Sequence, residues 1–212
     1  MRIETERLIL REFHENDWPA MLAYWKNPLY GRYNPELADP ESFVRDLVTR
    51  FVTAQAEQPR SARQLAIVDP ASGQMIGTCG IRINDPVQRE GNIGYELDPD
   101  VWGCGYATEA TSAILRFSFE ELGLHRVWAE CVADNTGSVR VLEKLGLRRE
   151  AHFREHRWFR DRWWDTRIYA ILDHEWREHP PVVGSPLAAT GVESRTFGRA
   201  DQRCQTIRHD SN

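Results

Sequence analysis

Two glycines occupy a short segment between a predicted strand and a predicted helix, in the sequence VWGCGYATEA at residues 101–110. Glycine lets the backbone turn tightly and lets a ligand contact bare N–H groups. The start of the helix near Tyr106 adds unsatisfied N–H donors and a partial positive charge. Together these features favour a phosphate-binding site, although a turn that needs two glycines and binds nothing has the same appearance.

The two common nucleotide motifs match this segment only in part. A mononucleotide P-loop requires G-x-x-x-x-G-K-[ST], and its lysine and hydroxyl residue are absent here. A dinucleotide fingerprint requires G-x-G-x-x-G, of which Gly103 and Gly105 supply the first half, while Thr108 stands at the third glycine. A protein that binds ATP or NAD therefore stays an open alternative.

The elements that must position this loop alternate between strand and helix patterns. Apolar alternation and turn residues predict strands at 3–13, 64–69, 75–83, 91–98 and 126–133, and two aromatic-rich strands within 150–171. Helical spacing and caps predict helices that begin near Asp17 and Asp39, then at 106–122, after Asp134 and Asn135, and at 173–178. We therefore expect an α/β (α+β) fold with a mixed central sheet of about seven strands and about four helices.

The strand at 91–98, the helix at 106–122 and the strand at 126–133 form a predicted βαβ unit. Its two strands should be parallel neighbours joined by a right-handed crossover. The glycine loop lies between the first of these strands and the helix.

Four motifs, taken in order, resemble those of the GCN5-related N-acetyltransferases (GNAT), and most closely the branch with the RimJ/RimL-type ribosomal-protein N-terminal acetyltransferases. They are ETERLILR at 4–11, GYATEA at 105–110, N-x-x-S-x-x-x-x-x-K-L-G-L at 135–147, and YAIL at 169–172 followed by Glu175 and Trp176. The resemblance covers residues 1–178. It implies a GNAT-like sheet with a central βαβ unit, and transfer of acetyl from acetyl-CoA to a primary amine by direct attack.

The resemblance also implies which residues bind the coenzyme. The family's loop, Q/R-x-x-G-x-G/A, places Trp102 at the Q/R position, Gly105 at the glycine and Ala107 at the last position. The segment implied to hold the pyrophosphate comprises Trp102, Gly103, Cys104, Gly105, Tyr106, Ala107 and Thr108. The preceding strand, at Tyr95, Glu96 and Leu97, is implied to orient the thioester. Asn135 is implied to contact coenzyme A if Asp134 caps the following helix; otherwise Asn135 is itself the cap.

Glu96 and Ser138 are the candidate catalytic residues. A carboxylate next to a coenzyme in a dry cleft has a raised pKa and suits a general base, although a mid-strand Glu can also face solvent or pair with an Arg. The family's usual tyrosine acid corresponds to Leu142, so Ser138 is our candidate to protonate the leaving thiolate, with Tyr95 as a further one. Because that tyrosine is absent, a coenzyme A-binding sensor without turnover stays an alternative.

The acceptor is a primary amine, either a protein N-terminus or a small molecule such as a polyamine, an amino sugar or an antibiotic. The family layout places the early aromatic residues on one wall of the acceptor site: Trp18, Trp25, Tyr30 and Tyr33. Residues 148–167, with seven arginines, are either an ordinary solvated hairpin or the opposite wall. The sequence does not indicate an oligomeric state.

Composition excludes several other classes. The net charge is −5, which argues against a whole-surface contact with nucleic acid or anionic membrane. No apolar run is long enough to span a bilayer and the N-terminus lacks a signal-peptide pattern, so we expect a cytoplasmic protein. The motif H-E-x-x-x-H at 174–179 is one residue too long for a zinc site, and we expect no metal. Residues 179–212 have the composition of a flexible C-terminal tail.

Overall fold

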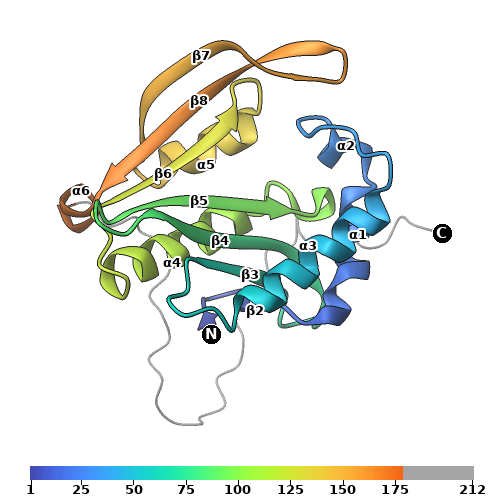
Figure 1. Cartoon of the computed structure of the whole chain (residues 1–212), viewed down its shortest axis with the longest axis horizontal. Helices are drawn as coiled ribbons and strands as arrows, with labels where there is room; N and C mark the ends of the chain where they lie inside the picture. Colours follow the sequence, from blue (N-terminus) through green and yellow to red (C-terminus); the bar gives the residue numbers. More distant parts are fainter. Residues whose placement is uncertain (179–212) are drawn as a thin grey trace.

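Eight strands form one mixed sheet in the computed structural model, which describes residues 1–178 (Figure 1). The strands are β1 (Arg2–Glu4), β2 (Ile9–Glu12), β3 (Ala62–Val68), β4 (Met75–Asp85), β5 (Glu90–Leu97), β6 (Arg126–Val132), β7 (Arg148–Phe159) and β8 (Arg162–Leu172). Their order across the sheet is β1-β2-β3-β4-β5-β6-β8-β7. Neighbours are antiparallel except β5 and β6, which are parallel as predicted for the βαβ unit.

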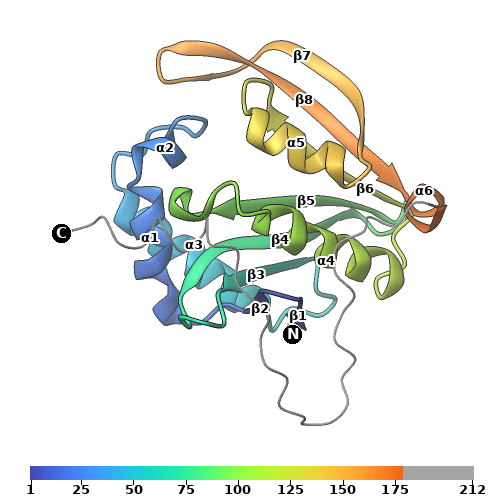
Figure 2. The same ribbon diagram turned by 180° about the vertical axis from the view of Figure 1, so that it is seen from behind.

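Helices cover both faces of this sheet (Figures 1 and 2). They are α1 (Trp18–Trp25), α2 (Pro28–Gly31), α3 (Pro40–Ala54), α4 (Tyr106–Glu120), α5 (Thr136–Lys144) and α6 (Asp173–Glu178). One core cluster lies under α4 and α5 and includes Leu65, Ile67, Ile114 and Leu142. A second core cluster lies under α1 and α3 and includes Met21, Val44, Val48 and Ala66. Successive residues of β3 thus enter opposite cores, as the alternation of side chains along a strand requires.

The sheet opens between β5 and β6. These two strands pair only from Glu90 to Asn92 and from Arg126 to Trp128, and β5 continues to Leu97 without β6 beside it. The two strands diverge beyond that point (Figure 1). The far side of the opening is formed by β6, α5 and the β7–β8 hairpin.

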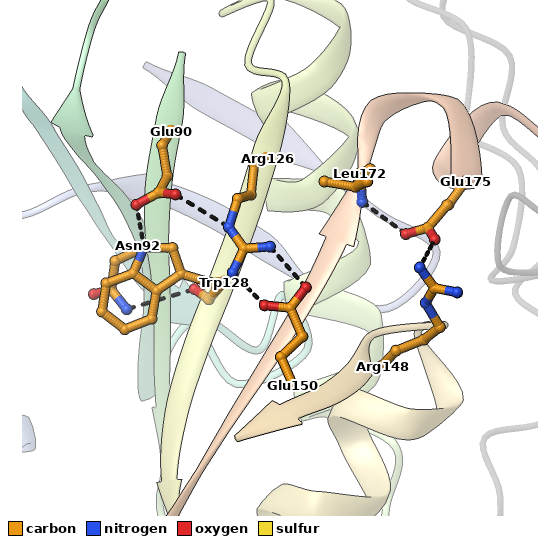
Figure 3. Close-up of polar contacts among 8 residues, drawn as sticks. All are labelled: Glu90, Asn92, Arg126, Trp128, Arg148, Glu150, Leu172 and Glu175. Atoms are coloured by element: carbon orange, nitrogen blue, oxygen red, sulfur yellow. Dashed lines mark hydrogen bonds and ion pairs between the residues drawn. The ribbon is translucent and has the colours of Figure 1, made fainter. Parts of the chain in front are cut away.

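A group of ion pairs closes the narrow end of this opening (Figure 3). The guanidinium of Arg126 on β6 donates to Glu90 on β5 at 3.0 Å and to Glu150 on β7 at 2.8 Å. The indole of Trp128 donates to the second oxygen of Glu90 at 3.1 Å. Arg126 therefore connects three strands where only three residue pairs join β5 to β6.

Two local predictions were wrong. The strand expected at 3–13 is two strands, because the chain turns at 5–8 with the Thr5 N–H bonded to the Leu8 carbonyl at 2.9 Å. Asp17 does not cap α1 with its side chain; its carboxylate pairs with Arg11 at 2.7 Å and accepts the His14 N–H. Burial alone would raise the pKa of Asp17, but these donors outweigh burial and hold that pKa below its ordinary value.

The other predicted elements are confirmed within a few residues of their limits, and the mixed α/β class is as expected. Residues 1–178 have eight strands where about seven were expected, and six helices where about four were expected, and α2 was not predicted. Asp39 caps α3 by accepting the Ser42 N–H at 3.1 Å, as its sequence context indicated. Among residues 1–178, every helix is too short or too polar to span a bilayer. The flexible tail predicted for residues 179–212 lies outside the described residues and stays a prediction.

Candidate active site

A cavity of about 840 Å³ lies where β5 and β6 separate. It is lined by the end of β5, the loop before α4, the first turns of α4 and α5, the end of β6, and the segment that contains α2. Eleven of the twelve predicted site residues line it: Tyr95, Glu96, Leu97, Trp102, Gly103, Gly105, Tyr106, Ala107, Thr108, Asn135 and Ser138. The side chain of the twelfth, Cys104, is not part of the lining; its backbone carbonyl accepts a hydrogen bond from Arg7.

The glycine loop ends at Gly105, which is the N-cap of α4. Gly105 has φ +81° and ψ 0°, a left-handed conformation that favours glycine. The helix begins at Tyr106, and its first backbone hydrogen bond joins the Glu109 N–H to the Gly105 carbonyl. The N–H groups of Tyr106, Ala107 and Thr108 come before that bond in the first turn. None of these three N–H groups has an acceptor within residues 1–178, and all three residues line the cavity. The loop can therefore present backbone donors to an anion.

Glu109 anchors this loop through Arg7. It is 4% exposed, and its carboxylate accepts the Thr5 hydroxyl at 2.6 Å, the Arg7 N–H at 2.8 Å and the Arg7 guanidinium at 2.7 Å. Arg7 also donates to the Cys104 carbonyl at 3.0 Å and lies over the Tyr106 ring. Glu109 is thus a structural residue, as its place in the first helical turn indicated.

Trp102 fixes the other end of the loop. Its indole N–H donates to the Leu97 carbonyl at 2.9 Å, which ties the loop to the last residue of β5. At this position the family's loop has Gln or Arg, whose polar side chain can contact a ligand. The structure shows that the Trp102 N–H instead makes an internal contact.

Asn135 is the side-chain cap of α5. Its Oδ1 accepts the Ser138 N–H at 3.1 Å, while the carboxylate of Asp134 pairs with Arg162 at 3.0 Å. The alternative in which Asp134 caps the helix and frees Asn135 is therefore wrong. Asn135 still lines the cavity, so its side-chain amide group faces the same space as the glycine loop.

Backbone groups of β5 are open toward the cavity. β4 pairs with β5 along its length, but β6 is absent beside Tyr95, Glu96 and Leu97. A strand with a neighbour on one side only leaves its outward N–H and C=O groups without a strand partner. Among these groups, the Leu97 carbonyl accepts the Trp102 indole N–H. These groups lie beside the cavity, and they suit a ligand that extends along the strand and needs hydrogen bonds from it.

Glu96 lies among aromatic side chains of α1 and α2. One oxygen, Oε2, accepts the Trp25 indole N–H at 3.2 Å and the Tyr24 hydroxyl at 3.3 Å. Burial raises the pKa of Glu96, and the neighbouring Tyr30, Trp25 and Tyr24 only partly offset that rise. A carboxyl with a raised pKa beside a cavity has the properties of a general base.

Ser138 contacts Tyr95 across the site. The Tyr95 hydroxyl lies 2.8 Å from Ser138 Oγ and donates to the Ser138 carbonyl at 3.1 Å. Burial raises the pKa of Tyr95, so its phenol stays protonated at neutral pH. Leu142, which stands where the family has a tyrosine acid, is fully buried in the core and does not line the cavity. Ser138 and Tyr95 are therefore hydroxyl donors on this side of the cavity, together with Thr136.

The cavity also contains charged residues that we did not single out from the sequence. Arg140 and Lys144 lie four residues apart on α5, and Arg32 follows α2. None of the three has a carboxylate partner within residues 1–178. A fourth, Arg157 on β7, pairs with Glu130 at 3.0 Å. The spacing of Arg140 and Lys144 after the Asn135 cap was the signal that could have identified a basic helix face.

The predicted acceptor walls are only partly formed by the residues named for them. Tyr30 and Tyr33 line the cavity. Trp25 is not part of the lining, but its indole N–H donates to Glu96, which is. Trp18 does not line the cavity. The guanidinium carbon of Arg45 lies 3.4 Å from the centre of its ring. The β7–β8 hairpin contributes Arg157 and Thr166. Within residues 1–178, no three His, Cys, Asp or Glu side chains are arranged to hold a metal ion.

Comparisons with known proteins agree with this architecture. A family model described as an acetyltransferase (GNAT) domain matches residues 7–148. The uncharacterized N-acetyltransferase YnaD of Bacillus subtilis is 32% identical over 176 residues, which cover 83% of this chain and 99% of YnaD. A solved GNAT-family acetyltransferase from Bacillus anthracis has 31% identity and a TM-score of 0.71, over 82% of this chain and 99% of that one. RimL, a ribosomal-protein acetyltransferase solved with coenzyme A, has the same fold at 21% identity and a TM-score of 0.70, over 81% and 98%.

Proposed function

This chain belongs to the GNAT acetyltransferase family, and we propose that it transfers an acetyl group from acetyl-CoA to a primary amine by direct attack. The observation that carries the proposal is the opening between β5 and β6. It brings a glycine loop with free backbone donors, an unpaired strand edge and a carboxylate with a raised pKa around one cavity.

The coenzyme is proposed to enter with its pyrophosphate at residues 103–107. The N–H groups at the start of α4 supply donors and a partial positive charge. Arg140 and Lys144 add positive charge without carboxylate partners, which suits the phosphates of the coenzyme. The pantetheine chain would then follow the open edge of β5, with Asn135 opposite it.

The chemistry assigned to Glu96 and Ser138 follows from their positions. The amine nitrogen forms a bond to the thioester carbonyl carbon, and the carbon–sulfur bond breaks. Glu96 accepts the proton released by the amine, directly or through a water molecule. Ser138 supplies a proton to the leaving thiolate, and Tyr95 holds the Ser138 side chain in place.

The acceptor is proposed to be a protein N-terminus or a small amine. RimL carries a ribosomal-protein acetyltransferase name, which favours the first possibility by analogy. The aromatic wall around Glu96 is compatible with either. Related structures carry names for different acceptors, a ribosomal protein for one and spermidine for another.

Thermal unfolding with acetyl-CoA, coenzyme A, ATP and NAD in parallel tests the coenzyme. Ligand at 100 times its Kd should add about 2.7 kcal/mol of stability, which is several degrees for a domain of this size. We expect the shift with acetyl-CoA and coenzyme A and its loss in Gly105→Val, where a Cβ would lie 3.4 Å from Arg7 and φ is +81°. The matched control is Gly73→Val, which has similar strain at φ +69° in the β3–β4 turn. A shift with ATP or NAD alone would contradict the proposal.

A coenzyme-binding sensor without turnover is the second candidate function, favoured by the burial of Leu142 where the family has a tyrosine acid. Steady-state release of free thiol with a panel of primary amines separates the two functions. An enzyme releases thiol above background hydrolysis with at least one amine. A sensor is stabilised by acetyl-CoA and releases none.

A further inference from the structure

Arg32 is a cavity residue whose positive charge is not neutralised. It directly follows α2 and lines the cavity, and its guanidinium makes no hydrogen bond or ion pair with residues 1–178. The guanidinium carbon lies 5.2 Å from the centre of the Tyr33 ring. Arg157, which also lines the cavity, is neutralised by Glu130. The two basic residues of α5 are proposed to face the coenzyme phosphates, so Arg32 is the basic residue of the lining that is left without a role.

The segment that carries Arg32, residues 29–34, is held across the opening of the sheet. The Tyr33 hydroxyl donates to the Asp134 carbonyl, just before α5, at 3.0 Å. Arg160, in the turn between β7 and β8, donates to the Asn34 carbonyl, also at 3.0 Å. Figures 1 and 2 both show α2 near the tip of the β7–β8 hairpin. These contacts fix the backbone on one side of Arg32 and give the guanidinium a defined place at the cavity wall.

The same segment places Arg32 near the proposed general base. Tyr30, two residues before Arg32, contacts Glu96, and all three residues line the cavity. Two residues span at most about 7 Å of backbone. An acceptor whose nitrogen meets Glu96 therefore has its neighbouring atoms within reach of the Arg32 guanidinium.

We propose that Arg32 binds an anionic group of the acceptor, so that the acceptor is an amine with a carboxylate or phosphate a few bonds from its nitrogen. This inference rests on the proposed function. A guanidinium donates two parallel hydrogen bonds to either anion and fixes its orientation as well as its position. With the nitrogen at Glu96 and the anion at Arg32, the acceptor is held at two points, which orients the nitrogen for attack.

The same arrangement disfavours polyamines. A second cation of the acceptor would lie beside Arg32, and like charges in close contact select against a ligand. Among the described residues the cavity lining contains two carboxylates, Glu96 and Glu130. Glu96 is needed for the reacting amine, and Glu130 is already paired with Arg157. A polyamine therefore finds no free carboxylate for its other cations.

Arg32→Gln tests this role without disturbing the fold. Arg32 is exposed and makes no hydrogen bond within residues 1–178, so the variant should melt close to the wild-type temperature. The matched control is Arg50→Gln, which removes an exposed arginine of α3 outside the cavity lining. A purely structural role for Arg32 predicts a lower melting temperature and the same kinetic loss with every acceptor.

Acceptors that differ only in charge give the main readout. The peptide pair is Ala-Asp-Ala amide and Ala-Asn-Ala amide, and the small-molecule pair is γ-aminobutyrate and butylamine. We expect the wild-type kcat/KM to favour the acidic member of at least one pair roughly tenfold or more, and spermidine to be a poorer acceptor than that member. The pair that shows the preference identifies the source of the anion as a peptide or a small molecule.

The variants then assign the preference to Arg32. Arg32→Gln should lower kcat/KM for the acidic acceptor roughly tenfold or more, leave its neutral partner unchanged, and leave KM for acetyl-CoA unchanged. Arg32→Glu should reverse the preference toward Ala-Lys-Ala amide or spermidine. A wild type that prefers neither acidic acceptor would overturn the inference, and so would equal losses with both members of a pair. A rise confined to KM for acetyl-CoA would also overturn it, because Arg32 would then contact the coenzyme.

A wild-type protein that binds acetyl-CoA but releases no thiol would refute the proposed transfer, and the anion site is then read from binding. The readout is thermal stabilisation by the same acceptors in the presence of coenzyme A. Stabilisation by an acidic acceptor that its neutral partner does not give, and that Arg32→Gln lacks, supports the anion site. The absence of stabilisation by both acidic acceptors overturns it.

Discussion

The hydroxyls of Tyr95 and Ser138 lie 2.8 Å apart, and they join β5 to α5 across the opening of the sheet. Either hydroxyl can be the donor in this contact, and when the Tyr95 hydroxyl donates to Ser138 Oγ, the Ser138 proton is available to a thiolate in the cavity. This contact supports the acid role proposed for Ser138 and a positioning role for Tyr95.

Ser138→Ala is therefore expected to lower kcat by roughly 10²-fold, with a smaller loss in Tyr95→Phe. The two losses should not add in the double variant, because both act on one hydrogen bond. The measurement is kcat at saturating acetyl-CoA. Thr49→Ala, which removes an exposed hydroxyl from α3 outside the cavity lining, is the control. An unchanged kcat in Ser138→Ala would exclude this acid.

Glu96→Gln is expected to change the pH dependence of turnover. Since the pKa of Glu96 is raised, the proton-accepting form should be lost at a higher pH than for an ordinary Glu, whose pKa is about 4.3. Wild-type kcat/KM should fall as the pH drops through that raised pKa. The Gln variant should be about 10²-fold slower and lack this acid limb. A retained acid limb would show that another group is the base.

Stability gives a separate check on Glu96. A carboxyl whose folded-state pKa is raised stabilises the fold below its unfolded-state pKa, and this stabilisation is lost as the pH rises through the folded-state pKa. At neutral pH the buried charge of Glu96 is therefore a cost. We expect Glu96→Gln to melt at or above the wild-type temperature at pH 7, and Glu120→Gln on the exposed face of α4 to melt at the wild-type temperature.

Glu109→Gln should weaken both the fold and the glycine loop. The substitution leaves the Arg7 guanidinium without its carboxylate, and Arg7 also holds the Cys104 carbonyl. Hydrogen bonds to charged groups contribute about 1.5–3 kcal/mol each, and Arg7 is partly exposed, so we expect a loss of about 2 kcal/mol. Calorimetry measures the loss, and titration with coenzyme A should show weaker binding. Normal affinity would mean that the loop keeps its shape without Arg7.

Arg126→Met tests the ion pairs at the narrow end of the opening (Figure 3). Removing the guanidinium leaves Glu90 and Glu150 without their shared cation. We expect a loss of about 1–2 kcal/mol, or several degrees, and a raised KM for acetyl-CoA because β5 and β6 are less firmly held. Arg177→Met, which breaks an exposed pair within α6, is the control. An unchanged KM would show that the three residue pairs between β5 and β6 hold these strands in place without Arg126.

Local sequence signals identified the elements that carry the site. The glycines before α4, the Asn135 cap and the apolar spacing of each strand depend on residues close together in the chain. Such patterns are governed by backbone sterics and by burial of one face, and these act over a few residues. The turn at residues 5–8 was missed because the side chain that stabilises it, Glu109, lies about a hundred residues away.

The sequence by itself thus determined the order of strands and helices, the parallel pairing of the βαβ unit and the loop that faces the cavity. Only the tertiary structure decided that β5 and β6 separate after three residue pairs and that Trp25 and Tyr24 bind Glu96. The reason is physical. Tyr24 and Glu96 are 72 residues apart, and their contact depends on how α1 packs on the sheet, which no local spacing encodes.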